Sequence, residues 1–158
     1  METREDRKFM LMAIQEGYKG MLNHEGGPFG AVIVKDGKVV GRGHNRVLKN
    51  NDPTCHGEMM AIRNACKKLG TFDLSGCVLY TSGECCTMCL CASLWANIEH
   101  VFYSCTLEDN AMIGFRDEKF DNIFSGRQEN LPGYCEQICH EEGLKLFEEY
   151  LKTNPQNY

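Results

Sequence analysis

The fold is set by residues 77–104, CVLYTSGECCTMCLCASLWANIEHVFYS. Residues 77–81 are a short apolar run of the length typical of a buried strand, and residues 101–104 are a second such run. The apolar residues 88–96 between them predict a short helix. A strand, a helix and a strand in this order predict a parallel pair, because the helix returns the chain to the same end of the sheet.

Upstream of this stretch, hydrophobic periodicity predicts a helix, a β-hairpin and a second helix, over residues 4–21, 31–40 and 58–69. The hairpin is indicated by Asp36-Gly37 between two valine-rich runs, and Gly70 follows the second helix as a stop signal. Near the C-terminus, Leu144 and Phe147 indicate a final helix. The alternation of strands and helices predicts a sheet with parallel members, covered by helices on both faces.

The composition indicates one domain over residues 1–158, since a chain of this length with 42% hydrophobic residues builds one core. The N-terminus has charges of both signs and no signal-peptide pattern, so we expect a cytoplasmic protein whose ten cysteines are thiols or metal ligands. The net charge of −5 and the lack of a Lys/Arg cluster argue against a nucleic-acid partner. No segment suits a membrane span. These features favour a small-molecule substrate.

Two short motifs, His-Gly-Glu at residues 56–58 and Cys-Thr-Met-Cys at residues 86–89, place metal-ligand residues at the starts of predicted helices. Cys86 and Cys89 can bind one ion from a single helical turn, and the helix dipole favours their thiolate forms. His56 would be the third ligand. Three protein ligands leave one tetrahedral position for water or hydroxide, which is typical of catalytic zinc. We therefore expect one Zn²⁺ per chain.

Glu58 follows the histidine by two positions, and we expect it to act as the proton shuttle beside the metal. A His-x-Glu motif followed by Cys-x-x-Cys is the arrangement of the zinc-dependent deaminases. The zinc-protease spacing His-Glu-x-x-His does not occur. One alternative stays open, a structural zinc site whose fourth ligand is a further cysteine: Cys55, Cys85, Cys91 or Cys105.

From about residue 26 to residue 103 the chain resembles bacterial guanine deaminases of the zinc-dependent cytidine-deaminase-like superfamily. The segments that carry this resemblance are residues 27–37, residues 51–56 before the zinc histidine, and residues 79–82 before the cysteine pair. The resemblance implies a three-layer α/β/α fold with helices on both faces of a mixed sheet of about five strands. It also implies hydrolytic deamination of guanine, a nucleobase, to xanthine and ammonia.

The resemblance further implies a base pocket formed by four residues: Phe29, Asn45, Trp95 and Tyr158. Phe29 and Trp95 would line the pocket, and Asn45 would hydrogen-bond the purine. Asp117 would be a second acid near the reacting edge of the base. The family also implies a homodimer that exchanges C-terminal segments, about residues 141–158, so that Tyr158 closes the pocket of the partner subunit.

Other functions share this metal chemistry and stay open. The protein could deaminate another base or a nucleoside, such as cytosine, an ammeline-type s-triazine or guanosine. A tRNA adenosine deaminase would need a more basic surface, and a non-catalytic zinc module would need a fourth protein ligand. The chain departs from the family pattern at Cys85 and Thr87, which stand where proline is common, and at Gly57, where the guanine enzymes have alanine.

Overall fold

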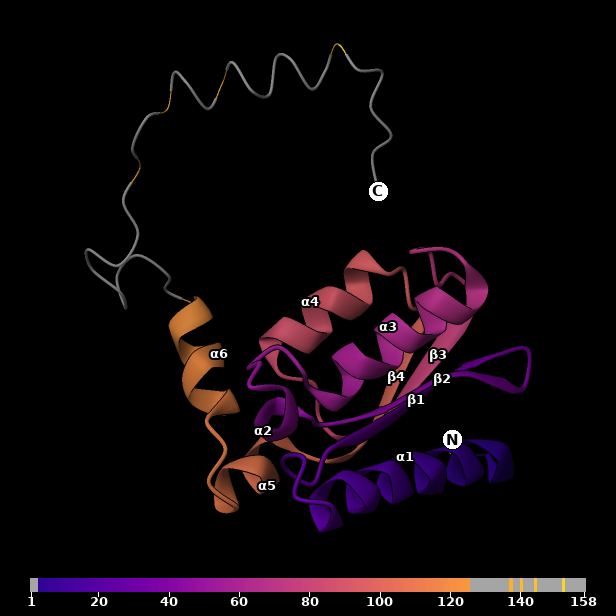
Figure 1. Cartoon of the computed structure of the whole chain (residues 1–158), viewed down its shortest axis with the longest axis horizontal. Coiled ribbons are helices and arrows are strands. Elements are labelled where there is room, and N and C mark those ends of the chain that lie inside the picture. The colour runs from indigo at the N-terminus through magenta and orange to yellow at the C-terminus, as the bar shows by residue number, and fades with distance from the viewer. Residues whose placement is uncertain (1–2, 126–136, 138–139, 141–143, 145–151, 153–158) are drawn as a thin grey trace. The chain divides into compact units, whose positions relative to one another are not determined.

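The computed structural model describes residues 3–125, together with residues 137, 140, 144 and 152. The chain divides into two compact units, Met1–Asp121 and Asn122–Tyr158. The first unit contains the sheet and both metal-ligand motifs (Figure 1). The segment predicted to be exchanged, residues 141–158, lies outside the described residues except for residues 144 and 152.

The helices and strands of the described chain are α1 (Arg4–Leu22), β1 (Gly30–Lys35), β2 (Lys38–His44), α2 (Val47–Asn50), α3 (Gly57–Leu69), β3 (Cys77–Gly83), α4 (Thr87–Trp95), β4 (His100–Cys105), α5 (Leu107–Met112) and α6 (Asp117–Ser125). The helices predicted over residues 4–21, 58–69 and 88–96 are confirmed as α1, α3 and α4, each within one residue at either end. None of the helices in the described ranges is both long and apolar enough to cross a membrane.

The sheet is mixed and has the strand order β2-β1-β3-β4. β1 is antiparallel to β2 and to β3, whereas β3 and β4 run parallel, as residues 77–104 predict. The turn of the β1–β2 hairpin is Asp36-Gly37, with φ angles of 49° and 71°. Positive φ at both positions is what a two-residue type I′ turn requires, so the predicted hairpin is confirmed.

Helices cover both faces of the sheet and create two hydrophobic cores (Figure 1). Ala31 and Ile33 of β1 pack in the core that lies under α3 and α4, whereas Val32 and Val34 pack in the core under α1. Alternate side chains of a strand point to opposite faces, so a strand covered on both faces needs an unbroken apolar run. The three-layer architecture is therefore confirmed.

β2 and α3 approach each other so closely that Gly41 has no room for a side chain. A Cβ atom at this position would contact the carbonyl oxygen of Ala61 and would lie 2.9 Å from the backbone nitrogen of Ala65. Because Ala61 and Ala65 belong to α3, this contact fixes the helix relative to the sheet, together with the His-Gly-Glu motif at the start of the helix.

The described chain has four strands rather than about five, because the residues that follow β4 form helices. Thr106 begins α5 with a capping box, in which its hydroxyl accepts from the backbone N–H of Asp109 and the Asp109 carboxylate accepts from the backbone N–H of Thr106. The sequence analysis did not predict α2, α5 or α6.

Candidate active site

The two metal-ligand motifs meet at the starts of α3 and α4. His56 is the N-cap residue of α3, Cys86 is the N-cap residue of α4, and Cys89 lies in the first turn of α4. Nδ1 of His56 lies 3.5 Å from Sγ of Cys86 and 3.6 Å from Sγ of Cys89. All three ligand atoms lie within 4.8 Å of one another. Zinc–ligand distances of about 2.0–2.3 Å in a tetrahedral site require similar separations.

The electrostatics of this cluster favour a thiolate at Cys86. A hydrogen bond from the Cys89 thiol, assisted by His56, lowers the pKa of Cys86 to about 4. The hydrogen bond between Cys86 and His56 raises the pKa of His56. Two sulfur atoms and one imidazole nitrogen form a donor set that zinc prefers, so these three residues fit a zinc ion.

Glu58 lies beside the cluster, in the first turn of α3, and is only 4% exposed. Its Oε2 atom has no hydrogen-bond partner among the described residues. Burial raises the pKa of this carboxyl, and the charge of Cys86 raises it further. A carboxyl with a raised pKa and one free oxygen can accept a proton and return it near neutral pH.

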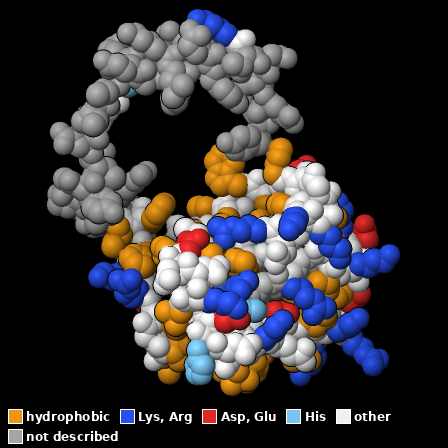
Figure 2. Space-filling view, viewed as in Figure 1, with side chains coloured by type: hydrophobic (Ala, Val, Ile, Leu, Met, Phe, Trp, Pro, Cys, Tyr) orange, Lys and Arg blue, Asp and Glu red, His pale blue; other side chains and the backbone are white. Residues whose placement is uncertain are grey.

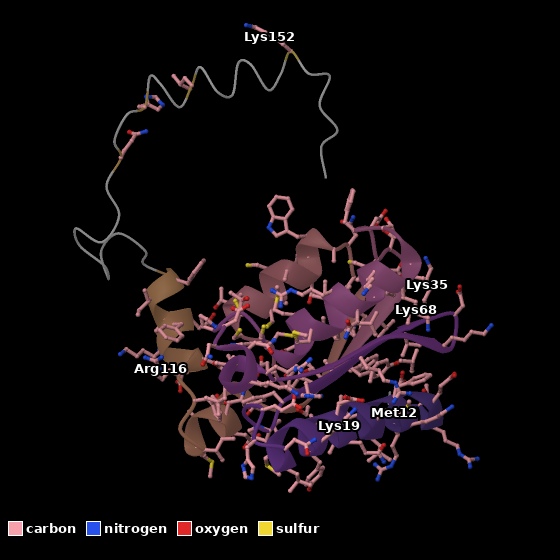
Figure 3. The ribbon with its side chains drawn as sticks, in the orientation of Figure 1. Met12, Lys19, Lys35, Lys68, Arg116 and Lys152 are labelled. Carbon is pink, nitrogen blue, oxygen red and sulfur yellow. The ribbon has the colours of Figure 1, made fainter. Side chains whose placement is uncertain are left out.

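Asp117, the first residue of α6, also faces the cluster. Burial raises the pKa of Asp117, and the charge of Cys86 acts in the same direction, whereas the hydrogen bond from Asn110 and the charge of His56 act against it. Nδ2 of Asn110 donates a hydrogen bond of 3.2 Å to Oδ2 of Asp117. The neighbouring Arg116 is exposed, and its guanidinium group lies over the ring of Phe120 at 5.1 Å (Figure 3). The carboxyl of Asp117, whose pKa is raised, thus lies close enough to Cys86 and His56 for their charges to act on it.

Phe29 and Asn45 lie next to each other at the start of α3. The backbone N–H of Asn45 donates to the carbonyl oxygen of Phe29 at 2.8 Å, and a Cβ atom at Gly57 would lie 2.9 Å from that same oxygen. Asn45 is 5% exposed, and its Oδ1 atom accepts from the backbone N–H of Val47. With Oδ1 engaged in this way, the side-chain Nδ2 atom is the group of Asn45 that could donate a hydrogen bond to a ligand.

The sequence model of the zinc-binding region of cytidine and deoxycytidylate deaminases matches residues 3–105, which include all three ligands and Glu58. The chain belongs to this deaminase family.

Two bacterial relatives of this deaminase are informative. Guanine deaminase of Bacillus subtilis (strain 168) is 50% identical over 109 residues, which are 69% of this chain and 70% of the relative. The X-ray structure of guanine deaminase from Bacillus subtilis superposes with a TM-score of 0.84 and 40% identity and covers 96% of both chains. The tRNA-specific adenosine deaminase of Aquifex aeolicus (strain VF5) is 42% identical over 96 residues, 61% of this chain and 63% of the relative.

Two of the residues predicted for the base pocket are not brought to the metal cluster of the deaminase by the described chain. Trp95 is the last residue of α4 and is 65% exposed. It lies nine residues beyond Cys86, which corresponds to about 13 Å along a helix. Tyr158 lies outside the described residues. The roles of Trp95 and Tyr158 stay predictions.

Two residues next to the deaminase site were missed by the sequence analysis. The ring of Phe115 packs edge-on against Phe29, with 4.7 Å between the centroids. Asn110 is 2% exposed and contacts Asp117. The Thr106 capping box could have placed Asn110 in a helix, but no sequence signal indicates that either residue approaches the site.

Proposed function

We propose that the protein is a zinc-dependent guanine deaminase, which hydrolyses guanine to xanthine and ammonia in purine salvage or catabolism. The observation that carries this proposal is the group of two sulfurs and one imidazole beside the buried carboxyl of Glu58. The choice of guanine is supported by the Bacillus subtilis guanine deaminase, which is related in sequence and similar over 96% of the chain in structure.

His56, Cys86 and Cys89 would hold a zinc ion, which would supply the Lewis acid that activates a water molecule at neutral pH. Glu58 accepts the proton that this water loses, and its unpartnered Oε2 atom is the acceptor. While the oxygen of the water attacks C2 of guanine, Glu58 returns the proton to a ring nitrogen. The raised pKa of Glu58 suits it to both transfers.

Asp117 is the second acid of the proposed reaction. Its raised pKa makes it a stronger proton acceptor than an exposed aspartate, so it can take a proton during the reaction and assist Glu58 when the exocyclic amine leaves as ammonia. The assignment is supported by the electrostatic interaction of the Asp117 carboxyl with Cys86 and His56, which requires the carboxyl to lie near these two residues.

The guanine base would stack on the ring of Phe29 and accept a hydrogen bond from the side chain of Asn45. Both residues lie beside the start of α3, where Glu58 is also found. Trp95, which is 65% exposed at the end of α4, would line the pocket, and Tyr158 would close the pocket of the partner subunit.

We also propose a homodimer, in which the C-terminal segments, about residues 141–158, are exchanged. α4 exposes three large apolar side chains, Leu90, Leu94 and Trp95, at 45%, 65% and 65%. Figure 2 shows apolar side chains gathered at the edge of the described chain where Figure 1 places α4. Apolar surface of this kind is typical of interfaces.

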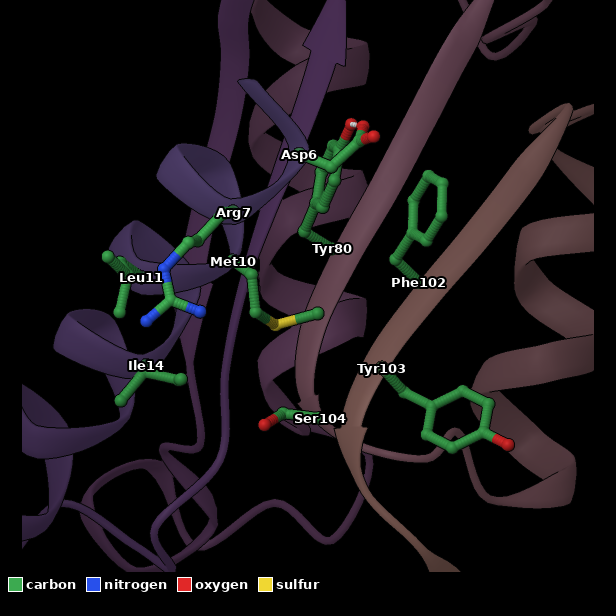
Figure 4. Close-up of a pocket in the computed structure, with 9 residues that line it drawn as sticks. All are labelled: Asp6, Arg7, Met10, Leu11, Ile14, Tyr80, Phe102, Tyr103 and Ser104. Atoms are coloured by element: carbon green, nitrogen blue, oxygen red, sulfur yellow. Dashed lines mark hydrogen bonds between the residues drawn. The ribbon is translucent and has the colours of Figure 1, made fainter. Parts of the chain in front are cut away.

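The free edge of β4 supports the exchange of segments. Within residues 3–125 β4 pairs with β3, and its other edge borders a hollow of about 460 Å³ between α1 and β4 (Figure 4). Met10, Ile14 and Phe102 line this hollow, and an apolar surface of this kind can receive the apolar side of a helix such as the one predicted near the C-terminus. Since Cys105 pairs with Gly83, a segment bound along β4 would end close to the metal cluster.

The exchange can be tested by complementation. Glu58→Gln subunits and subunits truncated before Tyr158 should each be inactive alone, whereas mixed dimers should regain activity if Tyr158 acts on the partner's site. A mixture that stays inactive, or a monomer in sedimentation equilibrium, would contradict this part of the proposal. We also propose that residues 1–158 form one functional domain that acts in the cytoplasm, a reducing compartment in which its ten cysteines can remain thiols or metal ligands.

The proposed reaction is tested by ammonia release from guanine, guanosine, cytosine, adenine and ammeline, with protein whose zinc content has been measured. Turnover of guanine with about one zinc per chain is the expected result. Zinc without turnover of guanine would contradict the proposal. Turnover of adenosine in a tRNA anticodon stem would instead favour the second candidate function, for which the Aquifex aeolicus relative is the observation.

A further inference from the structure

Asn110 is a buried polar residue with no role in the reaction described so far. It is 2% exposed and is the buried residue of α5, whereas the apolar Met112 and Ile113 beside it are 84% and 58% exposed. Burial of an amide in preference to neighbouring apolar side chains costs free energy unless the amide is hydrogen-bonded. The contacts of Asn110 therefore account for its position.

These contacts join the start of α6 to the end of β3. Nδ2 of Asn110 donates to Oδ2 of Asp117, and the carbonyl oxygen of Asn110 accepts from the backbone N–H of Phe115 at 3.1 Å. Oδ1 of Asn110 comes so close to Gly83 that a Cβ atom there would lie 3.0 Å away. The side chain of Asn110 thus connects the start of α6 to the sheet, while its backbone carbonyl closes the turn between α5 and α6.

The same turn carries Phe115 to the ring of Phe29. A Cβ atom at Gly27 would lie 2.6 Å from Cζ of Phe115, and a Cβ atom at Gly83 would lie 3.0 Å from Cδ1 of Phe29. Glycine at both positions leaves room for the two rings. The proposed base-stacking residue and the proposed second acid are therefore held by one packed unit.

We propose that Asn110 is a positioning residue, whose side chain orients the carboxyl of Asp117 toward the substrate. An amide nitrogen can only donate, so the oxygen that faces Asn110 cannot carry the proton of a protonated Asp117. The proton of Asp117 is thereby directed to Oδ1. This inference rests on the proposed deaminase function and on the role of Asp117 in it.

A double-mutant cycle tests whether Asn110 acts through Asp117. Asn110→Ala should lower kcat for guanine by about 10- to 100-fold and change KM less, because the acid is misplaced rather than the base pocket removed. In an Asp117→Asn background the same substitution should lower kcat little further, since the group that Asn110 orients is already absent. If the Asn110→Ala variant does not fold, Asn110→Asp takes its place in the double-mutant cycle.

A second readout does not depend on activity. Asn110→Asp combined with Asp117→Asn exchanges donor and acceptor, so the double variant should unfold in urea at a higher concentration than Asn110→Asp alone, measured on metal-free protein. The same double variant should stay catalytically impaired, because the acid has moved. Asn64→Asp is the matched control, since Asn64 is exposed on α3 and donates to the carbonyl oxygen of Arg42.

The outcomes separate the inference from the proposed function. Additive losses of kcat in the cycle, or no recovery of stability in the exchanged pair, would overturn the role of Asn110 while the wild-type protein still releases ammonia from guanine. Absence of ammonia release by the zinc-loaded wild type would overturn the proposed function and this inference together.

Discussion

Replacing Glu58 with glutamine should remove nearly all turnover of guanine and leave the metal cluster intact. The side chain is 4% exposed, its Oε2 atom has no partner among the described residues, and its pKa is raised by burial. Glutamine has the same shape but cannot accept and return a proton. Loss of general acid–base catalysis costs about 10²–10⁴-fold in kcat, equivalent to about 3–5 kcal/mol of transition-state stabilisation.

The stability of the Glu58→Gln variant separates this explanation from a folding defect. A buried carboxyl with one unpartnered oxygen is replaced by a buried neutral amide of the same shape, so the free energy of unfolding of the metal-free protein should change by no more than about 1 kcal/mol. Kinetics of ammonia release give kcat, elemental analysis gives zinc per chain, and urea titration gives the stability.

The control for this variant is Glu108→Gln, which makes the same chemical change at an exposed residue in the first turn of α5. It should keep wild-type kcat. The reasoning is refuted if Glu58→Gln retains more than about a tenth of wild-type kcat, since the loss expected for a proton shuttle is at least about 100-fold. Loss of zinc from the variant would make Glu58 a metal ligand instead.

Gly41→Ala should lower the free energy of unfolding by about 1–3 kcal/mol, because the added methyl group would lie 2.8 Å from Cβ of Ala65. An unchanged midpoint in urea unfolding would contradict this packing. A hydrogen bond with His44 lowers the pKa of Glu25 from 4.5 to about 2, so its contribution to stability is present above pH 4.5 and is lost as the pH falls toward 2. The urea midpoints of wild type and Glu25→Gln should therefore differ at pH 7 and converge near pH 2; a constant difference would argue against the ion pair. Cys86→Ala should lose most of its zinc and its activity, and a variant that still binds one zinc per chain would identify another cysteine as the ligand.

The sheet and its main helices could be predicted because their signals are local. The unbroken apolar runs of β1 and β3 follow from burial on both faces. Gly37 marks the turn of the hairpin and Gly70 marks the end of α3, and both glycines have positive φ. The metal cluster could be predicted for a similar reason. Cys86 and Cys89 are spaced for one helical turn, and the His-Gly-Glu motif at the start of the preceding predicted helix offered His56 as the third ligand.

The contacts around the second acid could not be predicted in the same way. The pair Asn110–Asp117 and the pair Phe29–Phe115 depend on a turn between two short helices that lack a strong hydrophobic repeat. The sheet of about five strands, which the resemblance implied, was wrong for the described chain, where Thr106 begins a helix directly after β4. Helix caps of this kind are visible in sequence, whereas the packing of one aromatic ring on another is not.

The burial of β1 on both faces also determines how the protein comes apart. Val32 and Ile33 belong to different cores, and β1 is hydrogen-bonded to a strand on each side. Amide protons in such a strand exchange with solvent only when both cores separate together. We therefore expect the helix layer that carries the metal ligands and the layer formed by α1 to unfold as one cooperative unit. A substitution that destabilises the core under α1 should then also destabilise the layer that carries the metal ligands.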